Sequence, residues 1–88
     1  MSDRRADRVR EEVRAYLLDE FLAGEDPSTL RDDTRLVGGG ILTSIDTIKL
    51  VAFLEDRYGI AFDAREVTGG QLATVRDIVA AVLAKRGA

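Results

Sequence analysis

The sequence contains no cysteine and no histidine among its 88 residues. Without cysteine, the chain can form no disulfide and offers no thiolate as a nucleophile or metal ligand. Without histidine, it lacks the commonest general base, pH switch and metal ligand of proteins. Both absences argue against most hydrolytic and metal-dependent chemistry. We therefore expect neither a catalytic residue nor a metal site.

Long apolar runs and a strong basic charge are also missing. No segment approaches the roughly 20 apolar residues that a membrane span needs, and no apolar stretch follows the arginines of the N-terminal MSDRRADRVREE, as a signal peptide would require. The formal charge of −3 argues against the basic face of a nucleic-acid-binding protein. We expect a soluble, cytoplasmic monomer that binds neither a membrane nor a nucleic acid.

Apolar residues spaced by three and four predict three substantial helices, over about 5–22, over 44–58 and from Thr74 onward. A short helical turn over 64–67 is expected after Asp63, which suits an N-cap. Gly59 is expected to end the second helix in a left-handed conformation. The residues that define the apolar sides of the three helices are Val9, Val13, Tyr16, Leu17 and Phe21; Ile45, Ile48, Val51, Leu54 and Tyr58; and Val75, Ile78, Val79, Val82 and Leu83. Leu50 and Phe53 widen the apolar surface of the second helix, which predicts a central position or a docking surface.

The segment over residues 25–43 is rich in Asp, Ser, Thr, Gly and Pro, which predicts an irregular loop. A loop longer than about 12–15 residues is usually functional or disordered. Five apolar residues within it predict that it is held across the core: Leu30, Leu36, Val37, Ile41 and Leu42. The expected fold is all-α, a small four-helix bundle of three main helices and one short helix with a long first loop. We expect one domain over 1–88, with frayed ends at about 1–4 and 86–88.

Ser44 follows a glycine-rich stretch at the predicted start of the second helix. Thr43 is a suitable N-cap, and Asp46 lies where the partner residue of a capping box belongs. The Ser44 hydroxyl would then lie beside unpaired N–H groups at the positive end of the helix dipole, where an anion is stabilised. Most serines at helix starts only cap, so the spacing alone favours a structural role. The chain has no histidine to activate this serine, so another protein would have to modify it.

Several segments, taken in their order along the chain, resemble a known family and favour a modified Ser44 over a purely structural one. They are Asp32-Asp33-Thr34-Arg35-Leu36, then Ser44-Ile45-Asp46-Thr47-Ile48-Lys49-Leu50-Val51, then Leu54-Glu55-Asp56-Arg57-Tyr58-Gly59-Ile60, then Ala73-Thr74-Val75-Arg76-Asp77-Ile78-Val79. Together they resemble the acyl carrier protein family and its peptidyl carrier relatives, with the family's spacing between the segments. The chain is expected to share the acyl-carrier-like fold.

The resemblance implies a freestanding carrier that is not itself an enzyme. Ser44 matches the serine that receives 4′-phosphopantetheine from coenzyme A through a separate phosphopantetheinyl transferase. The terminal thiol of this arm would hold an acyl or aminoacyl group as a thioester. The implied partners are that transferase and the loading, condensing and tailoring enzymes of a fatty-acid-like, polyketide or other natural-product pathway. The residues implied to dock them are Thr43, Ile45, Asp46, Ile48, Lys49, Ala52, Glu55 and Asp56.

Two residues depart from the family pattern. Thr43 replaces the family's aspartate, and Lys49 stands where the family often has glutamate, which predicts a carrier with a particular set of partners. The alternative is an unmodified helical interaction module with a degenerate carrier site.

A helix-turn-helix DNA-binding protein is disfavoured by the few basic residues in the second and last helices. No Gly-Lys-Ser/Thr follows Gly38-Gly39-Gly40, and Asp32-Asp33 lacks EF-hand spacing, so neither predicts a nucleotide or calcium site.

Overall fold

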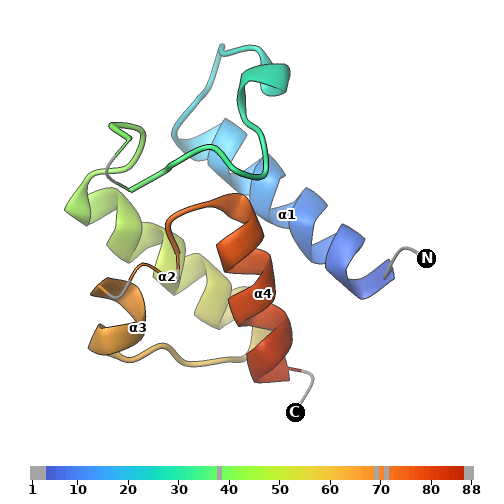
Figure 1. Cartoon of the computed structure of the whole chain (residues 1–88), viewed down its shortest axis with the longest axis vertical. Coiled ribbons are helices and arrows are strands. Elements are labelled where there is room, and N and C mark those ends of the chain that lie inside the picture. The colour runs from blue at the N-terminus through green and yellow to red at the C-terminus, as the bar shows by residue number, and fades with distance from the viewer. Residues whose placement is uncertain (1–3, 38, 69, 71, 87–88) are drawn as a thin grey trace.

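Three long helices and one short helix make up the computed structural model, which describes residues 4–37, 39–68, 70 and 72–86. The helices are α1 (Arg4–Glu20), α2 (Ser44–Tyr58), α3 (Ala64–Thr68) and α4 (Val75–Arg86), with a 3-10 turn, η1 (Pro27–Thr29), in the first loop. Figure 1 shows α1 beside α4 and α3 next to α2. α2 packs against both α1 and α4. These described residues contain no β-strand, which confirms the predicted all-α bundle.

The core lies where α1, α2 and α4 face one another, and it is closed by the first loop. The apolar spacing of α1 and α4 is confirmed. Val9, Val13 and Leu17 of α1 are buried against α4, and the buried residues of α4 lie on one side of that helix. Buried residues from the loops complete this core. The full set of buried apolar side chains is Val9, Val13, Leu17, Leu30, Leu36, Leu42, Leu50, Leu54, Tyr58, Leu72, Val75, Ile78, Val79 and Val82.

The helix ends follow the capping signals of the sequence. α2 runs from Ser44 to Tyr58 as predicted, and Gly59 ends it with a φ of 65°. The N–H group of Glu66 donates to the Asp63 carboxylate (2.9 Å) at the start of α3. The N–H group of Asp77 donates to the Thr74 hydroxyl (3.1 Å) at the start of α4. Local side-chain chemistry thus sets these boundaries.

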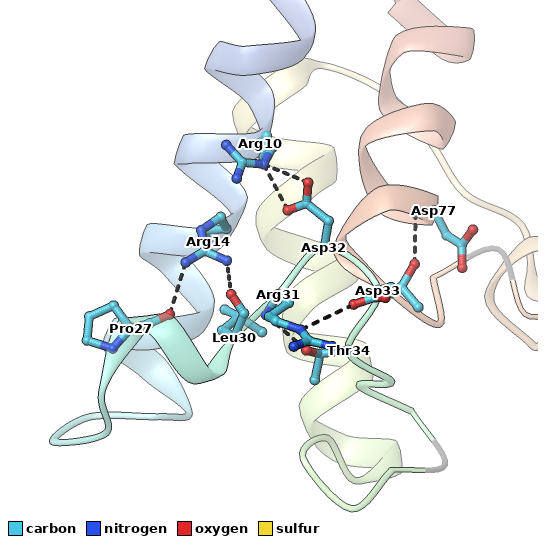
Figure 2. Close-up of polar contacts among 10 residues, drawn as sticks. Arg10, Arg14, Pro27, Leu30, Arg31, Asp32, Asp33, Thr34 and Asp77 are labelled. Carbon is cyan, nitrogen blue, oxygen red and sulfur yellow. Dashed lines mark hydrogen bonds and ion pairs between the residues drawn. The ribbon is translucent and has the colours of Figure 1, made fainter.

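The first loop is tied to α1 by two arginines (Figure 2). The Arg10 Nε atom donates to both carboxylate oxygens of Asp32, at 2.8 and 2.9 Å. The Arg14 guanidinium donates to the carbonyl oxygens of Pro27 and Leu30. Leu30 is buried beneath these contacts. The expected attachment of the loop across the core is therefore confirmed, and charged side chains of α1 reinforce it.

The same loop is also tied to the start of α4. The N–H group of Leu36 donates to the Ala73 carbonyl (2.7 Å), and that of Arg76 donates to the Asp32 carbonyl (3.0 Å). Leu36 and Leu42 are buried, whereas Val37 is exposed. These bonds hold the segment that leads into α2 against the rest of the bundle.

The 3-10 turn at residues 27–29 was not predicted from the sequence, which indicated an irregular loop there. Asp26 caps this turn by accepting a hydrogen bond from the N–H group of Ser28 (2.9 Å). Pro27 supplies a φ that suits the first position of the turn. α1 has already ended at Glu20, and the Asp-Pro pair begins a short turn of its own.

The predicted apolar side of α2 is partly wrong. Ile45 and Ile48 were placed with Leu54, but their side chains are 68% and 66% exposed. Ile45 and Leu54 are nine positions apart, or about two and a half helical turns, so they point in opposite directions. Thr47 takes the inward position instead and is 6% exposed. Its hydroxyl is satisfied because it donates to the Thr43 carbonyl (2.9 Å).

The aromatic residues pack in or against the core. The Tyr16 ring stacks on Phe53, with centroids 4.0 Å apart, and meets Phe21 edge to face at 5.7 Å. Tyr58 is buried, and its hydroxyl donates to Glu12 (2.8 Å). Phe62 is half-buried beneath the Lys85 ammonium, 4.9 Å from its ring centroid. These rings join the helices to one another.

The outer parts of the chain fall mostly outside the described residues. Arg4 begins α1 and Arg86 ends α4, while the rest of the expected frayed ends, 1–3 and 87–88, lies outside. Gly38 of the glycine run also lies outside. No described helix has the length and apolar character that crossing a membrane requires.

Candidate functional site

Ser44 is the first residue of α2, and its side chain is exposed. Thr43 precedes it as the N-cap in an extended conformation and forms the predicted capping box with Asp46. The N–H group of Asp46 donates to the Thr43 hydroxyl (3.1 Å), and that of Thr43 donates to the Asp46 carboxylate (3.1 Å). The box leaves the N–H groups of Ser44 and Ile45 in the first turn without an intrahelical partner. The Ser44 hydroxyl therefore lies at the positive end of the α2 dipole.

The Ser44 hydroxyl makes no hydrogen bond to any residue that the structure describes. Ser28 offers a contrast, because its hydroxyl donates to the Asp26 carboxylate (2.9 Å) and is committed to the 3-10 turn. The structural role that the spacing of Ser44 favoured belongs to its neighbour Thr43. Ser44 is thus a serine with a free hydroxyl at a helix N-terminus.

A surface cleft of about 780 Å³ opens beside Ser44. It lies between the first turn of α2, the loop before it and the segment that joins α3 to α4. Its walls are mainly apolar, formed by Val37, Leu42, Ile48, Val67 and Leu72, and Arg35, Thr43, Ser44 and Thr47 add polar groups. Val67 and Leu72 were not among the site residues predicted from the sequence. The signal that could have found Leu72 is one apolar residue within the polar break before α4.

The glycine-rich loop serves to turn the backbone toward Ser44. Val37 and Leu42 pair as an isolated parallel β-bridge, and the N–H group of Leu42 donates to the Leu36 carbonyl (3.0 Å). At Gly39 a Cβ atom would lie 2.2 Å from the Arg35 carbonyl oxygen, and Gly40 has a φ of 88°. Both positions therefore need glycine for the close turn itself.

The predicted docking residues do not form one uniform surface. Thr43, Ile45, Ile48, Lys49, Ala52 and Asp56 are exposed, whereas Asp46 and Glu55 are half-buried. The Asp46 carboxylate is held in the capping box. The Glu55 carboxylate accepts a hydrogen bond from the N–H group of Phe62 (2.8 Å), which fixes the link between α2 and α3. Of the three predicted docking acids, two are thus engaged in the protein's own structure.

Two acids of the first loop, Asp32 and Asp33, lie in ion pairs. Asp32 binds Arg10, as described above, and Asp33 lies 3.7 Å from the Arg31 guanidinium (Figure 2). Across the described ranges, no group of three or more Asp and Glu residues is arranged to hold a metal ion. Of the two loop acids, Asp32 holds the loop against α1, whereas Asp33 pairs within the loop.

Comparison with protein families adds a finding that is independent of this geometry. Residues 11–82 match a family model described as phosphopantetheine attachment site. A comparison with curated proteins gives no match. The family match covers most of the chain, from the second turn of α1 to the last turns of α4. The resemblance to acyl and peptidyl carrier proteins is confirmed, and the chain belongs to the family of phosphopantetheine attachment domains, which carry 4′-phosphopantetheine covalently.

Proposed function

We propose that Ser44 is the residue that carries the phosphopantetheine arm. The chain would act as a freestanding carrier for acyl or aminoacyl groups in a fatty-acid-like, polyketide or other natural-product pathway. When attached, the arm supplies a terminal thiol that holds its cargo as a thioester, which a chain without cysteine cannot otherwise provide. In this role the protein presents a substrate to separate enzymes and catalyses nothing itself.

The observation that carries this proposal is the free Ser44 hydroxyl at the N-terminus of α2. The matched residues 11–82 contain two serines, Ser28 and Ser44. The Ser28 hydroxyl is bonded to Asp26, whereas that of Ser44 is exposed and bonds to no described residue. Ser44 also lies in the segment that resembles the family's attachment motif. The geometry and the motif therefore favour the same serine.

The surroundings of Ser44 suit a phosphodiester. Such a group remains negatively charged near neutral pH, and the free N–H groups of Ser44 and Ile45 at the positive end of α2 would stabilise it. Beyond the phosphate, the apolar walls of the cleft, including Val37, Leu42 and Leu72, offer a place for the less polar parts of the arm and cargo. The residues present thus fit the group that the family carries.

The attachment step is a phosphoryl transfer from coenzyme A. The Ser44 oxygen bonds to the phosphorus that bears pantetheine, the pyrophosphate bond breaks, and adenosine 3′,5′-bisphosphate leaves. The serine proton would pass to a base on the transferase or to water, and the chain has no histidine to accept it. The carrier contributes an accessible hydroxyl, a positive helix end and a surface for the transferase. The predicted docking residues Thr43, Ile45, Ile48 and Lys49 lie next to that hydroxyl in the sequence and are exposed.

Intact-mass spectrometry tests the site. Incubation with coenzyme A and a phosphopantetheinyl transferase of broad specificity should add the mass of one phosphopantetheine to the wild-type protein. Ser44→Ala should abolish the addition, and the matched control Ser28→Ala should retain it. Addition to Ser44→Ala would show that the site is elsewhere. A wild-type protein that is never modified would favour the unmodified interaction module.

A further inference from the structure

The end of the bundle that holds the C-terminus of α2 gathers four arginines, which we call the arginine pole: Arg5 and Arg8 of α1, Arg57 of α2 and Arg86 of α4. Their side chains line two adjoining surface hollows of about 260 and 210 Å³, which share Arg8, Glu12 and Arg86. Because Arg57 follows Ser44 by almost the whole length of α2, the two lie about 20 Å apart along the helix axis. The hollows share no lining residue with the cleft beside Ser44 and form a separate surface.

The carboxylate of Glu12 compensates only part of the charge of the arginine pole. Among the described residues that line the two hollows it is the one acid, and it already accepts hydrogen bonds from the Arg57 guanidinium and the Tyr58 hydroxyl. The Arg86 guanidinium lies over the Tyr58 ring, 5.4 Å from its centroid. The side chains of Arg8 and Arg86 are exposed and form no hydrogen bond or ion pair within the part of the chain that the structure describes. These two guanidinium groups therefore remain available to an anion.

We propose that the arginine pole binds an acidic segment of a partner protein, a run of chain that carries several Asp or Glu side chains. A guanidinium group offers two parallel N–H donors to a carboxylate, which makes arginine the best residue for this contact. Arg8 and Arg86 line both hollows, whereas Arg5 lines only the smaller and Arg57 only the larger. The positive charge is thus spread over an elongated area, along which an extended chain can place successive carboxylates.

Two features favour an acidic segment over other anions. Glu12 lines both hollows, so a compact anion bound in either one would lie beside a carboxylate, whereas separate side chains of a segment can reach the arginines around it. The arginine pole also holds four of the thirteen basic residues of the chain, with one of its sixteen acids. The rest of the chain is therefore strongly acidic and would repel a long polyanion such as a nucleic acid.

Binding at the arginine pole would leave Ser44 uncovered, because the two surfaces lie at opposite ends of α2. A partner held there would keep the cargo on Ser44 at a raised effective concentration, as tethering does for any second contact. This consequence rests on the proposed function, whereas the binding of an acidic segment does not.

Titration of the protein into a fluorescently labelled hexaglutamate peptide tests the proposal, with anisotropy at low salt as the readout. Labelled hexaglutamine is the neutral peptide. The pole variant Arg8→Gln, Arg86→Gln removes the two available charges. The matched control, Arg65→Gln with Arg76→Gln, removes two exposed arginines of α3 and α4 that line neither hollow. Thermal unfolding of both variants confirms that they fold.

The wild-type protein should bind hexaglutamate saturably and should not bind hexaglutamine. Binding should weaken at physiological salt, because ions screen exposed charges. The pole variant should raise the Kd for hexaglutamate about five-fold or more, and the control should stay within about two-fold of wild type. The variant Arg8→Lys, Arg86→Lys keeps the charge but loses the paired donors, so its Kd should lie between those of wild type and the pole variant.

An NMR titration with hexaglutamate locates the contact. Amide signals should shift around Glu12, Arg57 and Arg86 and stay unchanged around Ser44. Absence of saturable binding, equal losses in the pole variant and the control, or shifts centred on Ser44 would each overturn the proposed site. Tighter binding of a single-stranded hexanucleotide than of hexaglutamate would overturn the acidic segment as its ligand. None of these measurements requires Ser44 to be modified, so the proposed function stands or fails separately.

Discussion

On its inward face α2 buries Leu50, Leu54 and Tyr58 almost completely, whereas on its outward face it leaves Ile45 and Ile48 about two-thirds exposed. The same helix thus carries large apolar side chains on opposite sides. Burial of the inward residues removes apolar surface from water and stabilises the bundle. The outward isoleucines gain little of this stabilisation. The fold therefore gives no reason for their presence, whereas the proposed contact with another protein would.

The polar groups of α2 divide in the same way. Thr43, Asp46 and Glu55 bond to backbone groups and define where the helix begins and how it joins α3. Ser44 and Lys49 are exposed, and their side chains bond to no described residue. An acidic or hydroxyl side chain on this helix is therefore informative about function only when its own hydrogen bonds are known.

The largest expected effect on stability tests this division with two truncations on the same helix. Leu54→Ala should lower the free energy of unfolding by about 2–5 kcal/mol, because it opens a cavity in the core. Ile48→Ala should change it by no more than about 0.5 kcal/mol, because that side chain is mostly in water. Urea unfolding followed by circular dichroism measures both. Similar losses in the two variants would show that Ile48 supports the fold.

The Ile48→Ala variant also tests whether the outward face of α2 is needed for the modification of Ser44. In the transferase assay, Ile48→Ala should slow the modification of Ser44 although the variant folds normally. If Ile48→Ala is modified at the wild-type rate, the outward face of α2 is not needed for this partner.

Much of the fold was predictable because local signals decide it. The bounds of α2 follow from Thr43 and Asp46 at one end and Gly59 at the other, and each acts within a few residues of the chain. The apolar periods of α1 and α4 were equally clear, since their buried residues recur along one side. The motif around Ser44 indicated the family, which the match over residues 11–82 confirms.

What escaped prediction depends on contacts between distant residues. Apolar residues cover much of α2, so the sequence did not show that Ile45 faces away from Leu54. The half-burial of Glu55 depends on the position of Phe62, and Leu72 joins the cleft only because the α3–α4 segment folds back beside α2. These long-range contacts separate the residues that hold the fold together from those that remain available to a partner.

A smaller change in stability is expected when Thr43, the N-cap of α2, is replaced. Thr43→Ala should destabilise the protein by about 1 kcal/mol, because the N–H group of Asp46 loses its acceptor. Thr43→Asp keeps an acceptor and adds a negative charge at the helix N-terminus, so its stability should equal or slightly exceed that of wild type. Thermal unfolding distinguishes the two variants.

Thr43→Asp also restores the residue typical of the family before the attachment serine. We expect the transferase to modify this variant faster than wild type, because recognition and capping then use the same side chain. An unchanged rate would show that Thr43 is not the reason for any slow modification.

The smallest expected change in stability concerns Glu12 of α1. Its carboxylate accepts hydrogen bonds from the Tyr58 hydroxyl and the Arg57 guanidinium at the end of α2. Burial alone would raise the pKa of Glu12, but these two hydrogen bonds and the charge of Arg57 outweigh it, so the pKa lies below its usual value of 4.5. Ionised Glu12 therefore stabilises the fold above about pH 4.5. This contribution is lost as the pH falls through the lowered pKa, because the protonated carboxyl no longer attracts Arg57.

Urea unfolding of wild type and Glu12→Gln from pH 7 to pH 3 measures this contribution. The wild-type protein should be more stable by no more than about 1 kcal/mol at pH 7, since the site is partly exposed to solvent. The difference should shrink toward zero near the acid end of the range. The neighbouring Glu11 is exposed on α1, so Glu11→Gln should show a much smaller difference at every pH. A difference for Glu12→Gln that stays constant with pH would mean that the side chain contributes packing rather than charge.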